Sequence, residues 1–324
     1  MENKKKLKIG VLFGGKSAEH EVSVISAQNI MKALDKNKYQ IFPVKINKNG
    51  KFNLNAVKNF DIIFPVLHGP YGEDGSIQGL LKLAGIPYVG AGVLGSAVGM
   101  DKDVMKRLLK EAGIPTCKFL ILLSLEKKSL KEISKVLGLP IFIKPANLGS
   151  SVGIHKVKNE ENWNSALKDA FQYDSKVIIE QAIKGREIEC AVLGNEKPIA
   201  SVPGEVIVNS EFYSYEAKYI DENGATVEIP TKIPKATIKK IRETAVKTFK
   251  VLNCEGMGRV DFFLKENGEI LVNEINTIPG FTDISMYPKL WEASGLPISK
   301  LLDKLIKLAI ERFNRESKLK TTIL

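Results

Sequence analysis

Short apolar runs alternate with amphipathic segments through the first part of the chain. A glycine pair, Gly14-Gly15, separates the first apolar run from the first amphipathic segment, as in open α/β sheets that place a helix N-terminus over a ligand. We predict that residues 1–90 form a small doubly wound domain with a parallel sheet. The pattern predicts strands over 8–13, 40–46 and 61–67 and helices over 19–34 and 76–84.

The clearest local pattern lies near the C-terminus, where the apolar runs 260–264 and 270–272 flank Asn267-Gly268. Asn-Gly between such runs is typical of a two-residue type I′ hairpin turn, which needs a positive φ at both central positions. That turn would place Asp261 opposite Glu274 and Arg259 opposite Asn276. A three-residue bulged turn would instead shift this pairing by one residue.

Two facing carboxylates repel each other across a hairpin and therefore need a cation. Carboxylate and amide oxygens are the ligands of a hard divalent ion such as Mg²⁺. Because side chains alternate along a strand, Arg259 and Asn276 share the face of Asp261 and Glu274. Merely solvated acids are the alternative, and they fit poorly because both acids sit in the middle of a strand. We expect the other face to be apolar, formed by Val260, Phe262, Leu264 and Leu271.

The middle of the chain, residues 91–183, suggests a second unit. Its strand over 139–144 ends in Lys144 and leads into a Gly/Ser-rich loop over 147–153. Loop N–H groups and hydroxyls donate to phosphate and a lysine supplies charge, so we predict a flap over phosphates; a flexible hairpin tip is the alternative. We also predict a glycine-rich linker over 90–99, a helix capped by Asp101 up to residue 112, and strands over 152–157 and 176–179.

The last unit, residues 184–324, contains a long polar and aromatic segment over 209–232. A loop of this length inside a compact domain is usually functional or disordered, and its tyrosines argue against disorder. We therefore predict a lid. We further expect a strand over 188–193, helices over 236–252 and 298–313, and an ordered loop over 276–290.

Composition narrows the class of protein. The chain has 324 residues, a net charge of +11 and three cysteines far apart, which fits a reducing cytosol rather than a disulfide framework. No apolar run is long enough for a membrane span. The lysines are scattered and aromatic residues are few, so the charge does not argue for nucleic-acid binding.

One motif is misleading. Residues 10–17 satisfy the P-loop pattern GxxxxGK[ST], which includes Lys16. A P-loop has its strand before the first glycine, whereas residues 11–13 here are the core of the predicted strand. We expect Lys16 to lie outside any phosphate site.

Taken together, seven segments resemble the D-alanine–D-alanine ligase family of ATP-grasp enzymes. They are GGKSAEHEVS (14–23), LHGPYGEDGSIQG (67–79), MDK (100–102), IKPANLGSSVG (143–153), EAKY (216–219), GRVD (258–261) and NEINTIPGFTDIS (273–285). The resemblance implies an α/β fold, α+β in the ATP-binding part, with three domains. It also implies that ATP converts a D-alanine carboxylate into an acyl phosphate, which a second D-alanine then attacks. The dipeptide would serve peptidoglycan precursor synthesis.

The same resemblance implies roles for individual residues. At the nucleotide, Lys102, Lys144 and Lys218 would meet phosphates under a cover of Ser150 and Ser151, Glu180 and Ile183 would meet adenine, and Glu187 the ribose. At the amino acids, Glu19 would bind the first ammonium, His68 would orient that substrate, Ser285 and Met286 would hold the second carboxylate, and Arg259 and the Gly280 N–H would stabilise the oxyanion. Asp261, Glu274 and Asn276 would hold two Mg²⁺, or Mn²⁺, and Glu19, Ser150 and Tyr219 would form a latch. Taken singly, Glu19 could merely complement a helix dipole and His68 could be a turn residue.

Two other functions remain open: a ligase that joins D-alanine to D-lactate, and a non-catalytic nucleotide-binding regulator. Tyr219 resembles the dipeptide-forming type, and the intact set of Arg259, Asp261, Glu274 and Asn276 argues against lost catalysis. A homodimer is usual in the family. We expect a cytoplasmic enzyme with small-molecule substrates only.

Overall fold

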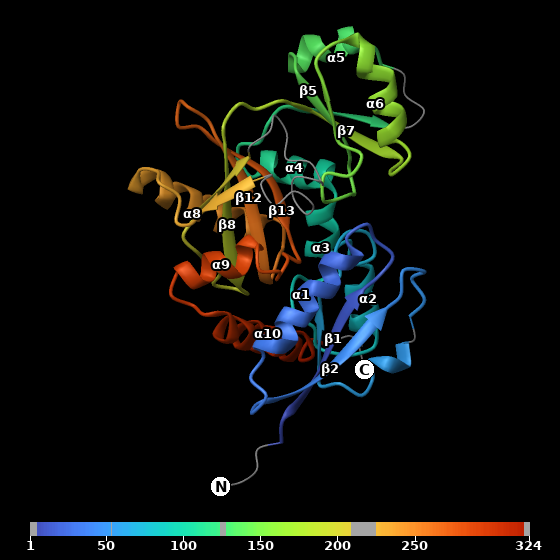
Figure 1. The fold of residues 1–324 in the computed structure, drawn as a ribbon, viewed down its shortest axis with the longest axis vertical. Coiled ribbons are helices and arrows are strands. Elements are labelled where there is room, and N and C mark those ends of the chain that lie inside the picture. Colours follow the sequence, from blue (N-terminus) through green and yellow to red (C-terminus); the bar gives the residue numbers. More distant parts are fainter. Residues whose placement is uncertain (1–4, 53, 124–127, 209–224, 321–324) are drawn as a thin grey trace.

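The computed structural model describes residues 5–52, 54–123, 128–208 and 225–320, and the strands within these ranges form three sheets (Figure 1). Their strand orders are β2-β1-β3, β4-β7-β5-β6 and β11-β10-β8-β12-β13, with β9 added beside β8. Figure 1 shows the central sheet at the top, the N-terminal sheet at the bottom, and the third sheet between them.

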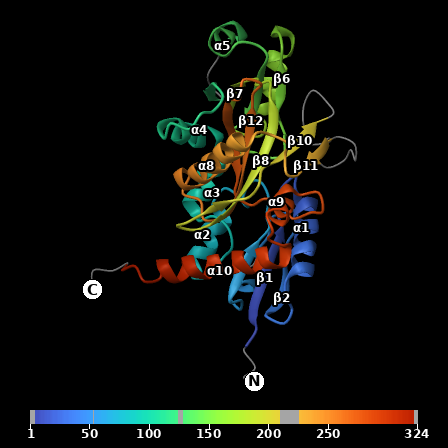
Figure 2. The ribbon, with the colours of Figure 1, turned by 90° about the vertical axis from the view of Figure 1, so that its left-hand side faces the viewer.

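The N-terminal sheet is parallel and covered on both faces, which confirms the predicted α/β class. It contains β1 (Leu7–Gly14), β2 (Tyr39–Ile46) and β3 (Ile62–Pro65). One face packs on α2 (Ser76–Leu83) and the other on α1 (His20–Ala33). The C-terminal helix α10 (Ile298–Glu316) joins the core on the α1 side through Leu301 and Leu305, so the end of the chain returns to its beginning (Figure 2).

The central sheet is antiparallel and has its own apolar core. Its strands are β4 (Phe119–Leu123), β5 (Ile141–Pro145), β6 (His155–Val157) and β7 (Lys176–Gln181). Two helices cover it, α5 (Leu130–Leu137), which begins with a capping box at Ser129, and α6 (Trp163–Ala170). The strand predicted over 152–157 is shorter than expected, because the chain still turns through residues 151–153.

The third sheet carries the predicted hairpin. Its strands are β8 (Arg186–Gly194), β9 (Ile199–Ala200), β10 (Gly204–Val208), β11 (Ala225–Glu228), β12 (Gly256–Leu264) and β13 (Ile270–Asn276). Three helices pack on it: α4 (Lys102–Glu111) and α8 (Lys235–Val251) on one core, α9 (Met286–Ala293) on another. The remaining elements are α3 (Val93–Met100) and the short helices Leu54–Ala56 and Glu160–Asn162.

Two predictions of irregular structure were wrong. The glycine-rich segment 90–99 is largely the helix α3, and its glycines permit close packing rather than flexibility. A Cβ at Gly95 would lie 2.5 Å from the Asn253 carbonyl oxygen, and one at Gly99 would lie 2.8 Å from Thr277 Cγ2. The predicted loop over 276–290 ends early, because α9 begins at Met286.

The predicted lid is only partly described. Residues 225–228 form β11 and pair with β10, so this part is regular sheet; residues 209–224 lie outside the described residues.

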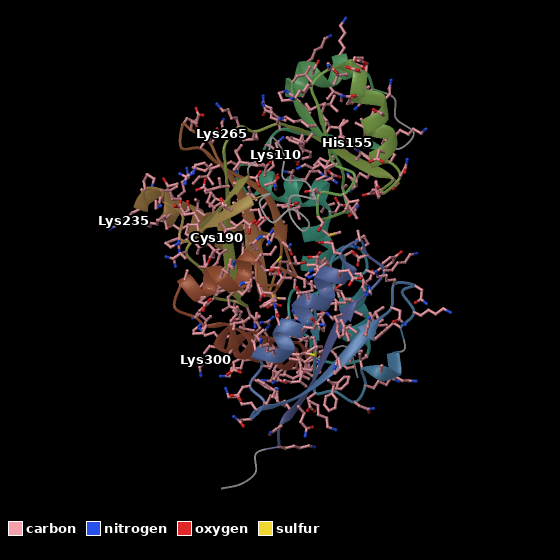
Figure 3. All side chains as sticks on the ribbon, viewed as in Figure 1. Lys110, His155, Cys190, Lys235, Lys265 and Lys300 are labelled. Carbon is pink, nitrogen blue, oxygen red and sulfur yellow. The ribbon has the colours of Figure 1, made fainter. Side chains whose placement is uncertain are left out.

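The domain boundaries at 90/91 and 183/184 stay predictions. No helix in the described ranges is both long and apolar enough to span a membrane. Figure 3 shows that the labelled lysines Lys110, Lys235 and Lys300 lie well apart.

Candidate active site

The hairpin of β12 and β13 pairs Asp261 with Glu274 and Arg259 with Asn276, as predicted. The predicted turn, however, was wrong. Lys265 and Glu269 close a three-residue loop, in which Gly268 has φ +81°. This shifts the register by one residue near the turn, where Leu264 pairs with Ile270.

A β-bulge then restores the predicted pairing. Between the pairs Asp261–Glu274 and Phe262–Val272, β13 carries one extra residue, Asn273. Without this bulge Glu274 would lie opposite Val260 and would point to the apolar face. The shift also corrects one further prediction: Leu271 pairs with Phe263 rather than joining the face of Phe262.

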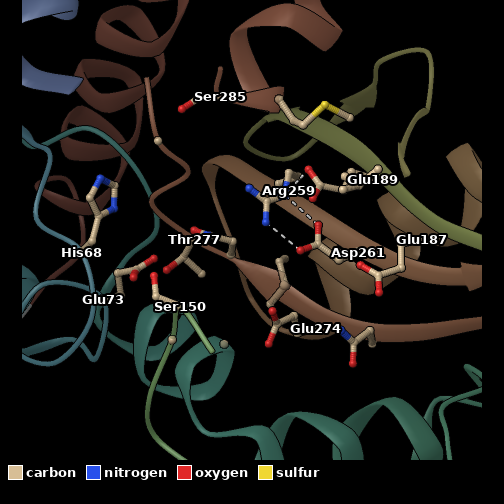
Figure 4. A pocket seen from close by; sticks show the side chains of 18 of the residues that line it. His68, Glu73, Ser150, Glu187, Glu189, Arg259, Asp261, Glu274, Thr277 and Ser285 are labelled. Atoms are coloured by element: carbon tan, nitrogen blue, oxygen red, sulfur yellow. Dashed lines mark hydrogen bonds and ion pairs between the residues drawn. The ribbon is translucent and has the colours of Figure 1, made fainter. Parts of the chain in front are cut away.

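The pocket beside this hairpin draws on all three parts of the chain (Figure 4). Twelve predicted site residues line it: Glu19, His68, Lys102, Ser150, Glu187, Arg259, Asp261, Glu274, Asn276, Gly280, Ser285 and Met286. Figure 4 shows His68 and Glu73 on one side of the pocket and Arg259, Asp261 and Glu187 on the other. The tertiary structure therefore gathers residues that are up to 267 positions apart (286 − 19).

Arg259 is held by two carboxylates. Its Nε and Nη2 each lie 2.7 Å from one oxygen of Asp261, and Nε also lies 2.8 Å from Glu189 Oε2. Burial lowers the pKa of Arg259, but the two carboxylates outweigh it, and the pKa lies well above its ordinary value. Arg259 is therefore a fixed cation in the pocket, oriented by two acceptors.

The three predicted metal ligands form an oxygen-donor set that fits a hard divalent ion. Asp261 and Glu274 face each other, and Asn276 Oδ1 is buried with no hydrogen-bond partner among the described groups. A buried acceptor of this kind is costly unless something binds it. Within the described ranges no three His, Cys, Asp or Glu side chains form a group that could hold a metal ion. Lys102 Nζ lies 3.4 Å from Glu274 Oε2 at the edge of this set.

The predicted phosphate loop connects β5 and β6. Its start is fixed because Asp174 accepts from both the backbone and side-chain nitrogens of Asn147. Ser150 and Ser151 then have φ of +53° and +60°, a conformation that costs energy for residues other than glycine and often marks a functional loop. The Ser150 hydroxyl donates to Glu19, which precedes α1. Lys102 Nζ donates to the Leu148 carbonyl, 2.7 Å away.

Lys144, near the end of β5 and just before this loop, and Glu180 on β7 do not line the pocket. Lys144 Nζ is 2.6 Å from Glu180 Oε2, and Lys106 Nζ is 2.9 Å from Glu180 Oε1. Burial raises the pKa of Glu180, but the two lysines lower it further than burial raises it, so the carboxylate stays charged. Ser151 and Ile183 also lie outside the pocket lining.

His68 and Glu73 form the opposite wall, and both are buried. Burial lowers the pKa of His68, and its Nε2 has no hydrogen-bond partner among the described groups. Glu73 accepts from the Gly69 N–H at 2.8 Å and from the Ile278 N–H at 3.2 Å. Burial, with the nearby charge of Glu19, raises the pKa of Glu73 to about 8.

The loop after β13 is anchored to the N-terminal domain. The Ser26 hydroxyl accepts from the Phe281 N–H at 3.0 Å, and Glu73 holds Ile278. Gly280 permits a close approach, because a Cβ there would lie 2.8 Å from the Ser285 hydroxyl oxygen. The Ser285 hydroxyl in turn accepts from the Thr282 N–H at 2.9 Å. The predicted oxyanion donor and carboxylate-binding serine are thus adjacent.

Comparison with known proteins agrees with this geometry. Residues 108–307 match the family described as D-ala D-ala ligase C-terminus, and residues 8–59 and 52–91 match D-ala D-ala ligase N-terminus. The chain is 51% identical to the D-alanine–D-alanine ligase of Oceanobacillus iheyensis, covering 98% of this chain and 99% of that protein. It is 47% identical to D-alanine–D-alanine ligase A of Salmonella typhimurium over 98% of this chain and all of that protein. The chain belongs to the D-alanine–D-alanine ligase family.

Solved structures of this family superpose closely on the chain. The D-alanine–D-alanine ligase of Coxiella burnetii matches with a TM-score of 0.87 and 40% identity, covering 97% of this chain and 96% of that one. The Bacillus anthracis ligase complexed with ATP matches with a TM-score of 0.83 and 33% identity over 96% and 99%. VanG D-Ala:D-Ser ligase of Enterococcus faecalis matches with a TM-score of 0.85 and 38% identity over 94% and 100%. The three-domain ATP-grasp architecture is confirmed.

Some residues with strong contacts were not among the predicted site residues. Lys106, Glu73 and Glu189 have strong partners in the structure but no distinctive motif of their own, although Glu73 lies within the quoted segment 67–79. Arg186, which had no assigned role, pairs through Nε and Nη2 with Glu205 and contacts Thr231 at the end of the predicted lid. Lys218 and Tyr219 lie outside the described residues.

Proposed function

We propose that the protein joins two D-alanine molecules to D-alanyl-D-alanine, with ATP converted to ADP and phosphate. The observation that carries this proposal is the facing pair Asp261 and Glu274, set beside Arg259 and Lys102 in one pocket. A carboxylate is a poor electrophile, and this arrangement suits its activation by phosphate rather than attack by a protein nucleophile.

In the first step, an oxygen of the first D-alanine carboxylate attacks the γ-phosphorus and ADP leaves. This step needs positioning and charge neutralisation more than covalent chemistry. Lys102, Lys144 and Lys218 supply positive charge, Ser150 and Ser151 cover the phosphates, Glu180 and Ile183 contact adenine, and Glu187 binds the ribose. Asp261, Glu274 and Asn276 would hold two Mg²⁺, or Mn²⁺, which neutralise phosphate charge when bound.

In the second step, the amine of the second D-alanine attacks the acyl carbon, loses a proton and displaces phosphate. Arg259 and the Gly280 N–H stabilise the oxyanion, a contribution of about 3–4 kcal/mol for a well-placed donor. Glu19 binds the first ammonium, and His68, kept neutral by burial, orients that substrate. Ser285 and the Met286 backbone bind the second carboxylate.

The second substrate is D-alanine rather than D-lactate, because the predicted latch of Glu19, Ser150 and Tyr219 would place no positive charge beside the incoming nucleophile. That arrangement suits a neutral amine and gives no help to a hydroxy acid. The Ser150 donation to Glu19 supports two of the three latch members. We further propose a cytoplasmic homodimer.

Product analysis tests the assignment. ATP, Mg²⁺ and D-alanine are supplied with equal D-lactate and, because one structural relative is a D-Ala:D-Ser ligase, equal D-serine. The expected main product at pH 8 is D-alanyl-D-alanine. Predominant depsipeptide would favour the D-lactate ligase, predominant D-alanyl-D-serine would change the second substrate, and nucleotide binding without any product would favour a regulator.

A further inference from the structure

Lys106 is a fully buried lysine, 0% exposed, that the proposed reaction does not yet use. It lies one turn after Lys102 on α4, so both side chains leave the same face of the helix. Burial lowers the pKa of Lys106, but the Glu180 carboxylate outweighs that effect and holds the pKa above its ordinary value. A charged lysine is costly to bury unless it is paired and hydrogen-bonded, so the partners of Lys106 show what its charge is bound to.

One partner of Lys106 is the bulge of the metal-binding hairpin. Its Nζ donates to the Asn273 carbonyl, 3.1 Å away, and Asn273 is the extra residue of that bulge. The bulge decides whether Glu274 points toward Asp261 or toward the apolar core. A buried donor fixed to Asn273 therefore favours the register in which the two carboxylates face each other.

A second partner is Glu180, which Lys106 shares with Lys144, and a weaker third contact joins Lys106 Nζ to Cys117 Sγ at 3.4 Å. Two lysines and one carboxylate leave a net charge of +1 in this buried group. Without Lys106, Glu180 would neutralise Lys144 completely. Lys106 thus maintains a positive charge near the end of β5, the strand that leads into the phosphate loop.

We propose that Lys106 is a positioning residue of the ligase, holding Glu274 opposite Asp261 through Asn273 and leaving the charge of Lys144 for the nucleotide through Glu180. This proposal rests on the proposed function, because it concerns the same metal and phosphate groups. The two contacts make separate contributions, one to the Mg²⁺ requirement and one to nucleotide affinity.

The test compares Lys106→Met with the parent and with Lys110→Met, which removes the same charge from an exposed position of the same helix (Figure 3). Calorimetry measures binding of a non-hydrolysable ATP analogue over a range of Mg²⁺ concentrations, without D-alanine. In Lys106→Met we expect nucleotide binding to weaken by about tenfold, which corresponds to the free energy of one hydrogen bond to a charged group. We also expect the Mg²⁺ concentration that nucleotide binding requires to rise roughly tenfold, as when a protein loses a group that orients a metal ligand. Lys110→Met should match the parent, and the KM for D-alanine should stay within about twofold in all three.

The double variant Lys106→Met/Glu180→Gln separates the two contacts and keeps the test valid if the single variant does not fold. It removes the carboxylate that would neutralise Lys144, and its reference is Glu180→Gln alone, because Glu180 is also a proposed adenine contact. Lys106→Met should lower nucleotide affinity less in this background than in the parent, and it should raise the Mg²⁺ requirement equally in both. If folded Lys106→Met keeps the nucleotide affinity and the Mg²⁺ requirement of the parent, the proposal is overturned, whatever the melting temperature of the variant. Recovery of the Mg²⁺ requirement in the double variant would overturn the role of Asn273. A parent that binds the nucleotide but forms no dipeptide would count against the proposed function instead.

Discussion

The two walls of the pocket use opposite electrostatics. On the wall formed by α4 and the β12–β13 hairpin, buried charges have partners of opposite sign, as in the Arg259–Asp261 pair. On the N-terminal wall, His68 and Glu73 are buried with backbone contacts in place of an ion pair, and the pKa of each moves toward the neutral form.

This difference matches the two kinds of ligand. A charged wall suits phosphates and metal ions, whose own charge replaces the internal ion pairs when they bind. The N-terminal wall combines these neutral buried groups with Glu19, and this combination suits a small zwitterionic substrate whose ammonium Glu19 would bind. We expect substitutions of the charged groups to change catalysis strongly and a substitution of Glu73 to change mainly the pH dependence of stability.

Glu274→Gln should have the largest effect. It keeps the shape of the side chain but removes a metal-binding charge, so turnover should fall on the order of a thousandfold, as for the loss of a charge-stabilising group in phosphoryl transfer. The measurement is phosphate release as a function of Mg²⁺, with a melting curve to show folding. Glu269→Gln is the matched control. Glu269 lies on the same hairpin, and among the ion pairs described its one partner is the partly exposed Lys265. Unchanged metal dependence in Glu274→Gln would show that the facing carboxylates do not bind metal.

Lys144→Ala should have a smaller effect, confined to the nucleotide. Loss of a charged contact to phosphate should raise the KM for ATP by about tenfold to a hundredfold. Lys16→Ala, in the misleading P-loop motif, should change it little, because Lys16 is exposed and does not line the pocket. Steady-state kinetics with varied ATP give the ranking, and the reverse order would move the phosphate site to the N-terminal domain.

Glu73→Gln should have the smallest effect on catalysis and a visible effect on stability. The pKa of Glu73 is raised from 4.5 in the unfolded chain to about 8 in the folded protein. Between these values the folded state binds more protons than the unfolded state, so stability should fall as the pH rises from 4.5 to 8. Glu73→Gln cannot titrate and should flatten this slope. Melting temperatures at several pH values measure it, and an equally steep slope in the variant would assign the pH dependence to another group.

The sequence by itself determined the local chemistry of the site. Alternation along each strand placed Arg259 on the same face as Asp261, and Glu274 on the same face as Asn276, because side chains two residues apart in a strand point the same way. Hydrophobic periodicity predicted many of the helices and strands, but it missed α3 and α9. The family resemblance, confirmed by the comparisons, supplied the functional roles.

Only the tertiary structure decided how that chemistry is held in place. The pairing of Asp261 with Glu274 depends on a three-residue turn and a bulge at Asn273 whose shifts cancel, and no local pattern indicated the bulge. The partners of Lys106 come from β7 and β13, 74 and 167 residues away (180 − 106 and 273 − 106), and Glu73 reaches Ile278 across 205 residues. Burial and such long-range contacts set the charge and position of these groups, because both depend on which distant segments the fold brings together.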